Sequence, residues 1–79
     1  MKVELCFYAS FASRLPENRE GNSCTTEIDE GSTVRELLDK MGLPEDLPKI
    51  VFLNGLHAKY DDVLKPGDRL AVFPPIAGG

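Results

Sequence analysis

Residues 33–42 have the sequence TVRELLDKMG, which carries the local signals of a short amphipathic helix. Thr33 and Glu36 stand three residues apart, the spacing of a capping box at the start of a helix. The apolar residues recur with the helical period and so share one face: Val34, Leu37, Leu38 and Met41. Gly42, followed by Pro44, ends the pattern. We therefore predict one helix over residues 33–41 with a face that must be buried.

Strand patterns precede this helix. Residues 2–8 alternate between apolar and other side chains, which is typical of a strand with one buried face. Residues 24–29 are rich in Thr and are predicted to form a second strand, antiparallel to the first. Between them we expect a short helical turn over residues 10–15 and a polar loop over residues 17–23.

A hairpin and a last strand follow the helix. The apolar run at residues 50–53 leads into Asn54-Gly55, the strongest short signal for a β-hairpin, and a returning strand at residues 56–58. The segment Lys65-Pro66-Gly67-Asp68 favours a type II turn, because Pro fixes φ and Gly supplies the positive φ that this turn needs. The last strand is predicted over residues 69–73.

The order strand, strand, helix, hairpin, strand predicts an α+β fold, a mixed sheet with one main helix packed on one face. We expect a single domain over residues 1–73 and a flexible tail over residues 74–79. One helix covers only one face of such a sheet, so the other face must be polar or meet a partner. The alternation places Tyr8 and Phe73 on that second face, as an aromatic patch beside the tail. The alternative is that Phe73 is one more edge of the core.

Composition and charge exclude several classes of function. Nine basic residues against 13 acidic ones give a net charge of −4, which disfavours a nucleic-acid partner and favours a basic protein surface. The apolar runs are too short to span a bilayer, and the N-terminal residues lack the apolar core of a signal peptide. We expect a cytoplasmic protein with no membrane association.

No catalytic, metal or nucleotide motif is present in the sequence. The two cysteines, Cys6 and Cys24, are too few for a disulfide scaffold or a zinc site. Their positions in the alternation of the two predicted strands place their side chains on opposite faces of the sheet. His57 is interpreted as a surface loop residue, and Asp61 and Asp62 as solvated side chains. Glycine-rich phosphate-binding motifs are missing. The chain is therefore expected to bind no metal or cofactor and not to be an enzyme by itself.

The end of the sequence is the candidate site, in the segment Phe73-Pro74-Pro75-Ile76-Ala77-Gly78-Gly79. Two prolines stiffen the segment next to the last strand, whereas the two glycines lack a Cβ and fit a channel too narrow for other side chains. The carboxylate of Gly79 would then be the most reactive group of the chain. The alternative is that Gly78-Gly79 is a frayed, unselected end.

These features resemble a known family. The order of elements, Asn54-Gly55, the run from Leu64 to Val72 and the Pro-Pro-x-x-Gly-Gly ending are similar to the small, sulfur-carrying subunit of molybdopterin synthase. That subunit is the MoaD branch of the MoaD/ThiS group, which has the β-grasp, ubiquitin-like fold. The sequence departs from common relatives in the polar loop at residues 17–23 and in Ala77, where a hydroxyl residue is frequent.

The resemblance implies a function for the tail. A ubiquitin-activating-type adenylyltransferase would use ATP to adenylate Gly79, and a sulfur donor would displace AMP to leave a thiocarboxylate. The large subunit of molybdopterin synthase, joined to this chain in a heterotetramer, would then use the sulfur on a pyranopterin precursor. Gly78, which has no side chain, would precede the residue that carries the sulfur. The partner-binding residues implied are Tyr8, Phe73, Pro74, Pro75, Ile76 and Ala77.

Other functions remain open at this stage. A sulfur carrier of another pathway, such as thiamine thiazole synthesis, would also end in Gly-Gly. A ubiquitin-like protein modifier would instead join Gly79 to a lysine through an isopeptide bond. In a third hypothesis the domain is a non-catalytic interaction module with an idle tail.

Overall fold

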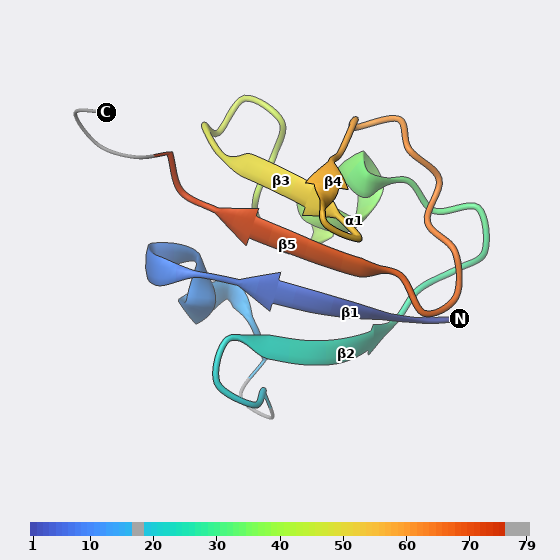
Figure 1. Cartoon of the computed structure of the whole chain (residues 1–79), viewed down its shortest axis with the longest axis horizontal. Helices are drawn as coiled ribbons and strands as arrows, with labels where there is room; N and C mark the ends of the chain where they lie inside the picture. Colours follow the sequence, from blue (N-terminus) through green and yellow to red (C-terminus); the bar gives the residue numbers. More distant parts are fainter. Residues whose placement is uncertain (17–18, 76–79) are drawn as a thin grey trace.

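The computed structural model describes residues 1–16 and 19–75, which form one mixed sheet and one main helix (Figure 1). The five strands lie in the order β2-β1-β5-β3-β4. The elements are β1 (Lys2–Phe7), η1 (Ala9–Arg14), β2 (Ser23–Glu27), α1 (Val34–Lys40), β3 (Ile50–Leu53), β4 (Leu56–His57) and β5 (Arg69–Phe73). This arrangement is the predicted ubiquitin-like β-grasp fold, and each predicted element is present within a residue or two of its expected bounds.

The first and last strands lie side by side at the centre of the sheet. β1 pairs with β5 in parallel, and Leu5 is opposite Leu70. All other neighbours are antiparallel, with β2 beside β1 and β3 beside β5. Because β5 is enclosed between β1 and β3, the strand that leads into the tail is firmly held along its length.

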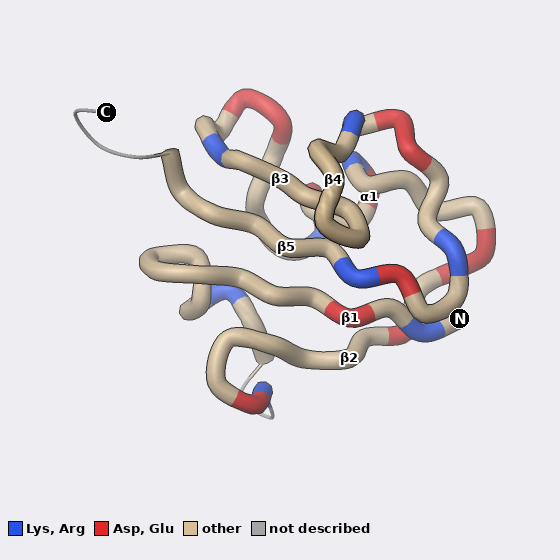
Figure 2. The backbone as a smooth tube through the Cα atoms, in the orientation of Figure 1, with Lys and Arg blue, Asp and Glu red and all other residues tan. Residues whose placement is uncertain are grey.

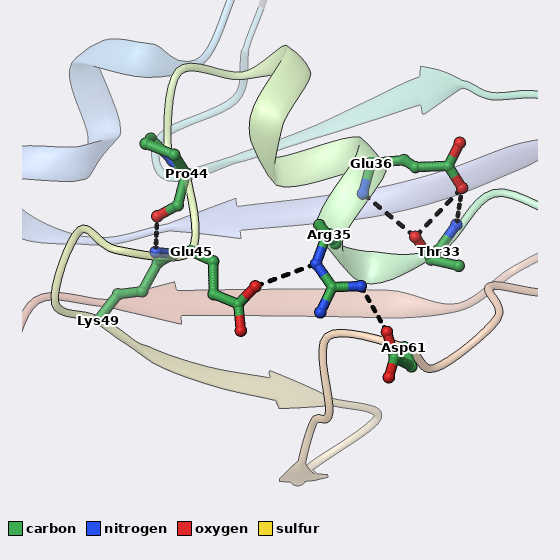
Figure 3. Close-up of polar contacts among 7 residues, drawn as sticks. All are labelled: Thr33, Arg35, Glu36, Pro44, Glu45, Lys49 and Asp61. Atoms are coloured by element: carbon green, nitrogen blue, oxygen red, sulfur yellow. Dashed lines mark hydrogen bonds and ion pairs between the residues drawn. The ribbon is translucent and has the colours of Figure 1, made fainter.

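The helix begins and ends as its sequence predicts. The Thr33 Oγ1 accepts a hydrogen bond of 3.2 Å from the backbone N–H of Glu36, and the Glu36 carboxylate accepts one of 3.0 Å from the N–H of Thr33 (Figure 3). This capping box satisfies N–H groups that the first turn of a helix leaves without partners. At the other end Gly42 takes a φ of +80°, a left-handed conformation that a helix C-terminus favours for glycine.

The core lies between the sheet and α1, which is behind the sheet in Figure 1. Alternate residues of β1 and β5 face the helix, and Phe11 and Leu15, in and just after η1, pack into the same cluster. The side chains that are fully enclosed there include Leu5, Phe7, Val34, Leu38, Leu43, Leu70 and Val72. The apolar face of α1 and the apolar faces of β1 and β5 therefore pack against each other on one side of the sheet.

The two turns that flank β4 and β5 are tied to each other. Asn54 and Gly55 have φ values of +53° and +85°, as a two-residue hairpin of type I′ requires. The Asn54 side chain donates to Asp68 Oδ1 at 2.9 Å and accepts from the N–H of Arg69 at 2.9 Å. Gly67 has a φ of +83°, and the N–H of Asp68 donates to the carbonyl of Lys65 at 3.1 Å, as predicted for the type II turn.

Arg35 joins α1 to the loops on either side of the hairpin (Figure 3). Its Nε donates to Glu45 at 3.0 Å and its Nη1 to Asp61. The hydrogen bond to Asp61, and to a smaller extent the one to Glu45, raises the pKa of Arg35 above its ordinary value. Asp62 in turn accepts a hydrogen bond of 2.9 Å from the backbone N–H of Lys59. Both carboxylates thus have partners within the protein, and the interpretation of Asp61 and Asp62 as merely solvated is incomplete.

The helices of the described residues are short. α1 has seven residues and η1 six, and no helix within residues 1–16 and 19–75 has the length and apolar character needed to cross a membrane.

Candidate functional site

A row of aromatic rings crosses the face of the sheet that α1 leaves uncovered. The ring of Tyr8 stacks on that of Phe73, with centroids 4.5 Å apart and planes 4° from parallel. Phe73 meets Phe52 edge to face at 6.0 Å, and Phe52 meets His57 at 4.6 Å. The row therefore extends from the end of β1 across β5 and β3 to β4. The prediction that Tyr8 and Phe73 share the second face is confirmed, and the alternative that Phe73 belongs to the core is wrong.

The register of the strands explains why these rings align. Phe52 is opposite both Ala71 and His57, so its side chain lies on the face opposite the buried Val72 and Val51. Tyr8 prolongs the pairing of β1, since its N–H donates to the carbonyl of Val72 at 3.1 Å.

A left-handed residue then turns the chain away from this face. Ala9 has a φ of +53°, unusual for a residue with a Cβ, and the chain reverses so that Phe11 enters the core on the other side. The local conformation thus leaves Tyr8 on the open face while the next aromatic residue is buried.

An apolar groove of about 490 Å³ lies along this row. We call it the aromatic groove, and it is lined by Tyr8, Ala9, Ile50, Phe52, His57, Phe73 and Pro74. Figure 2 shows no acidic or basic residue at this end of β1 and β5. Pro74 begins the segment that leaves the sheet, so the groove adjoins the point at which the tail starts.

The other end of the same face is polar. Arg69 donates from Nε to the Cys6 Sγ at 3.2 Å, and the same nitrogen is 3.7 Å from Glu4. The hydrogen bond to Cys6 is the main cause that raises the pKa of Arg69 above its ordinary value. The open face thus divides into an apolar half beside the tail and a polar half near the start of β5.

The two cysteines are free and lie on opposite faces, as predicted. Cys24 is opposite Leu5 and therefore faces the core, whereas Cys6 lies under Arg69 with 1% of its surface exposed. Burial, with a smaller contribution from Cys6, raises the pKa of the Cys24 thiol. A protonated thiol is a weak nucleophile, which argues against Cys24 as a sulfur-transfer residue.

Part of the predicted site falls outside the described residues, namely Ile76, Ala77, Gly78 and Gly79. Of the other partner-binding predictions, Tyr8, Phe73 and Pro74 meet in the aromatic groove, and Pro75 is exposed next to it. Sequence reasoning missed Ile50 and Phe52, because the continuous apolar run of β3 conceals which residues face the core. His57 also lies in β4 rather than in a loop.

Within residues 1–16 and 19–75, no three His, Cys, Asp or Glu side chains gather in an arrangement that could hold a metal ion. The aromatic groove offers an apolar surface beside the start of the tail.

The fold is that of the small ubiquitin-like proteins, with the aromatic groove on the face of the sheet that α1 leaves open. The chain belongs to the ThiS family, which it matches over residues 16–79. A comparison with curated proteins gives no match.

Solved structures with the same fold come from archaea and bacteria. The putative molybdopterin converting factor subunit 1 of Pyrococcus furiosus is 25% identical with a TM-score of 0.73, over 95% of this chain and 98% of that one. SAMP1, small archaeal modifier protein 1 of Haloferax volcanii, is 24% identical with a TM-score of 0.74, and both chains are covered fully. One chain of a complex of subunits 1 and 2 of the Helicobacter pylori molybdopterin-converting factor matches at 21% identity with a TM-score of 0.63, over all of this chain and all of that one.

Proposed function

We propose that this protein carries sulfur for molybdopterin synthesis as a thiocarboxylate on Gly79. The observation that carries the proposal is the aromatic groove, an apolar docking face that ends at Pro74, where the tail begins. A carrier needs such a face to dock on an enzyme while its terminal group enters the active site. Membership of the ThiS family and the likeness to the Pyrococcus furiosus subunit support this reading.

In our proposal the chemistry takes place on partner enzymes. A ubiquitin-activating-type adenylyltransferase joins the Gly79 carboxylate to the AMP part of ATP and releases pyrophosphate. A hydrosulfide equivalent from the sulfur donor attacks the acyl carbon, AMP leaves, and a thiocarboxylate remains. The large subunit of molybdopterin synthase then takes the sulfur to a pyranopterin precursor. All these partners are cytoplasmic in our proposal.

The length of the tail suits this division of work. Six residue steps beyond Phe73 span at most about 20 Å, which reaches from a docked face into an enclosed active site. Ordering each residue in such a channel costs roughly 1–2 kcal/mol, and the fixed φ angles of Pro74 and Pro75 reduce that cost. Because Gly78 has no side chain, backbone and nucleotide can approach closely.

The direct test is a mass measurement on the intact protein. Incubation with ATP, the adenylyltransferase and a sulfur donor should add about 16 Da as sulfur replaces one oxygen of the Gly79 carboxylate, next to which Gly78 has no side chain to hinder approach. Addition of the large subunit and the pyranopterin precursor should then return the mass to its original value. A thiocarboxylate that forms but is not consumed by this pair would contradict the molybdopterin pathway and leave the sulfur-carrier chemistry intact.

Docking itself is tested by Phe73→Ala. Removal of the ring should weaken binding to the large subunit by more than about 1 kcal/mol, because interface aromatic residues that fill pockets dominate binding energy. Phe73 is only half-buried and lies outside the core, so the variant should stay folded. Calorimetry measures the affinity, and Thr25→Ala in β2 is the matched control, since Thr25 lies away from the groove.

A protein modifier is the second candidate, favoured by the full-length likeness in fold to the small archaeal modifier protein. In that case a lysine amine, rather than sulfide, would attack the activated Gly79. The ThiS family match also fits a carrier for thiamine thiazole synthesis. A lysine adduct of another protein in place of the mass gain would favour the modifier.

A further inference from the structure

The turn between β3 and β4 carries a dipeptide whose two residues can react with each other. In Asn54-Gly55 the backbone nitrogen of Gly55 follows directly after the residue that bears the carboxamide, and Gly55 has no Cβ to hinder the approach of the two groups. Both residues are exposed, so water reaches the turn. The turn is therefore a candidate site of deamidation, the conversion of an asparagine side chain to a carboxylate.

Deamidation needs only water and a base. The Gly55 nitrogen loses its proton to the base and forms a bond to the Asn54 Cγ, while Nδ2 takes up a proton and leaves as ammonia. Water then opens the cyclic imide by breaking the bond from the ring nitrogen to one of its carbonyl carbons. Breakage at Cγ gives aspartate, whereas breakage at the backbone carbon gives isoaspartate, in which the main chain runs through Cβ and Cγ.

The fold holds the Asn54 carboxamide away from this reaction. Its Oδ1 accepts a hydrogen bond of 2.9 Å from the N–H of Arg69, and its Nδ2 donates one of 2.9 Å to Asp68 Oδ1. The backbone N–H of Asn54 also donates to the carbonyl of Arg69 at 2.9 Å, so the turn lies beside the start of β5 (Figure 1). The carboxamide must leave both of its partners before its Cγ can turn to the Gly55 nitrogen.

Asp68 is itself fixed in position. Its Oδ2 accepts a hydrogen bond of 2.8 Å from the N–H of Lys65, and its own N–H donates to the carbonyl of Lys65 at 3.1 Å. A carboxylate is a stronger acceptor than a neutral group. Removal of the Asp68 carboxylate should therefore free the Nδ2 end of the Asn54 carboxamide.

We propose that Asn54 is a deamidation site that Asp68 protects in the folded protein, and that the reaction separates the β3–β4 hairpin from β5. This inference does not depend on the function proposed above. An aspartate at this position cannot donate to Asp68, and it sets two carboxylates next to each other, where they repel. An isoaspartate adds a backbone atom to a two-residue turn and so disturbs the register that sets Phe52 opposite His57.

The test is incubation of the folded protein in mildly alkaline buffer, followed by peptide mapping that separates asparagine, aspartate and isoaspartate. Asp68→Ala should deamidate at Asn54 about fivefold faster than the wild type, which corresponds to about 1 kcal/mol for the lost hydrogen bond. Asp68→Asn keeps an acceptor oxygen without the charge and should react at an intermediate rate. In concentrated urea the hydrogen bonds are absent, so all three chains should react equally fast.

Gly67→Ala is the matched control. It strains the same turn, because Gly67 has a φ of +83°, but it retains the Asp68 carboxylate, and the added methyl contacts nothing among the described residues. It should react more slowly than Asp68→Ala. If it reacts as fast, protection comes from the order of the whole turn, and the role given to Asp68 is wrong. Equal rates for folded wild type and both Asp68 variants, or slower rates for the variants, would also overturn that role.

The structural consequence is tested with Asn54→Asp, which carries the charge of the product from the start. This variant should unfold at a lower urea concentration than the wild type, and the backbone N–H groups of the hairpin should exchange faster with deuterium. Asn54→Asp that matches the wild type in both measurements would show that the hairpin stays attached to β5 without the carboxamide. The second half of the proposal would then be wrong.

Discussion

Removal of Gly79 should abolish the mass gain of about 16 Da that the adenylyltransferase and sulfur donor give the intact chain. The new terminal carboxylate, on Gly78, would be withdrawn by about 3.5 Å, the length of one residue. Reacting atoms must approach to within about 3–3.5 Å, and a misplacement of about 1 Å already costs a hundredfold in rate. Intact-mass spectrometry after a fixed incubation measures the loss.

Matched variants separate loss of chemistry from loss of folding. All residues of the core cluster lie between Val3 and Val72, so the truncated protein should unfold at the same denaturant concentration as the wild type. Cys6→Ser and Cys24→Ser should retain the full mass gain, because neither thiol carries the sulfur in the proposed cycle. Sulfur found on a cysteine, or a normal gain by the truncated chain, would contradict the assignment of Gly79.

Leu38→Ala should have the largest effect on the fold. Leu38 is 0% exposed at the centre of the face that α1 presents to the sheet. Replacement of a buried leucine by alanine costs about 2–5 kcal/mol, from lost burial and from the cavity left behind. Because a small domain is stabilised by only about 5–15 kcal/mol in total, the midpoint of urea unfolding should fall markedly.

Asp39→Ala is the matched control for this substitution. Asp39 follows Leu38 on the same helix but is exposed, and surface substitutions usually change the free energy of unfolding by less than about 0.5 kcal/mol. If Leu38→Ala lost no more than this control, α1 would not pack against the sheet in solution.

The sequence by itself determined the elements of this fold and the side chains that α1 and β5 bury. The capping box of Thr33 and Glu36, the Asn54-Gly55 turn and the turn at Pro66-Gly67 are local devices, and each has the predicted geometry. Local signals of this kind depend only on residues close together in the chain, so they can be recognised from the sequence before the fold is known. The alternation of β5 likewise placed Phe73 on the open face.

Only the tertiary structure decided how the aromatic groove is assembled. Every residue of β3 is apolar, so alternation cannot indicate which side Phe52 occupies, and its pairing with Ala71 settles this. The local hairpin at Asn54-Gly55 sets His57 opposite Phe52, so the face on which His57 lies follows once Phe52 is placed. A surface shared by strands far apart in the sequence is fixed by register, and register is set by the packing of the whole sheet on α1.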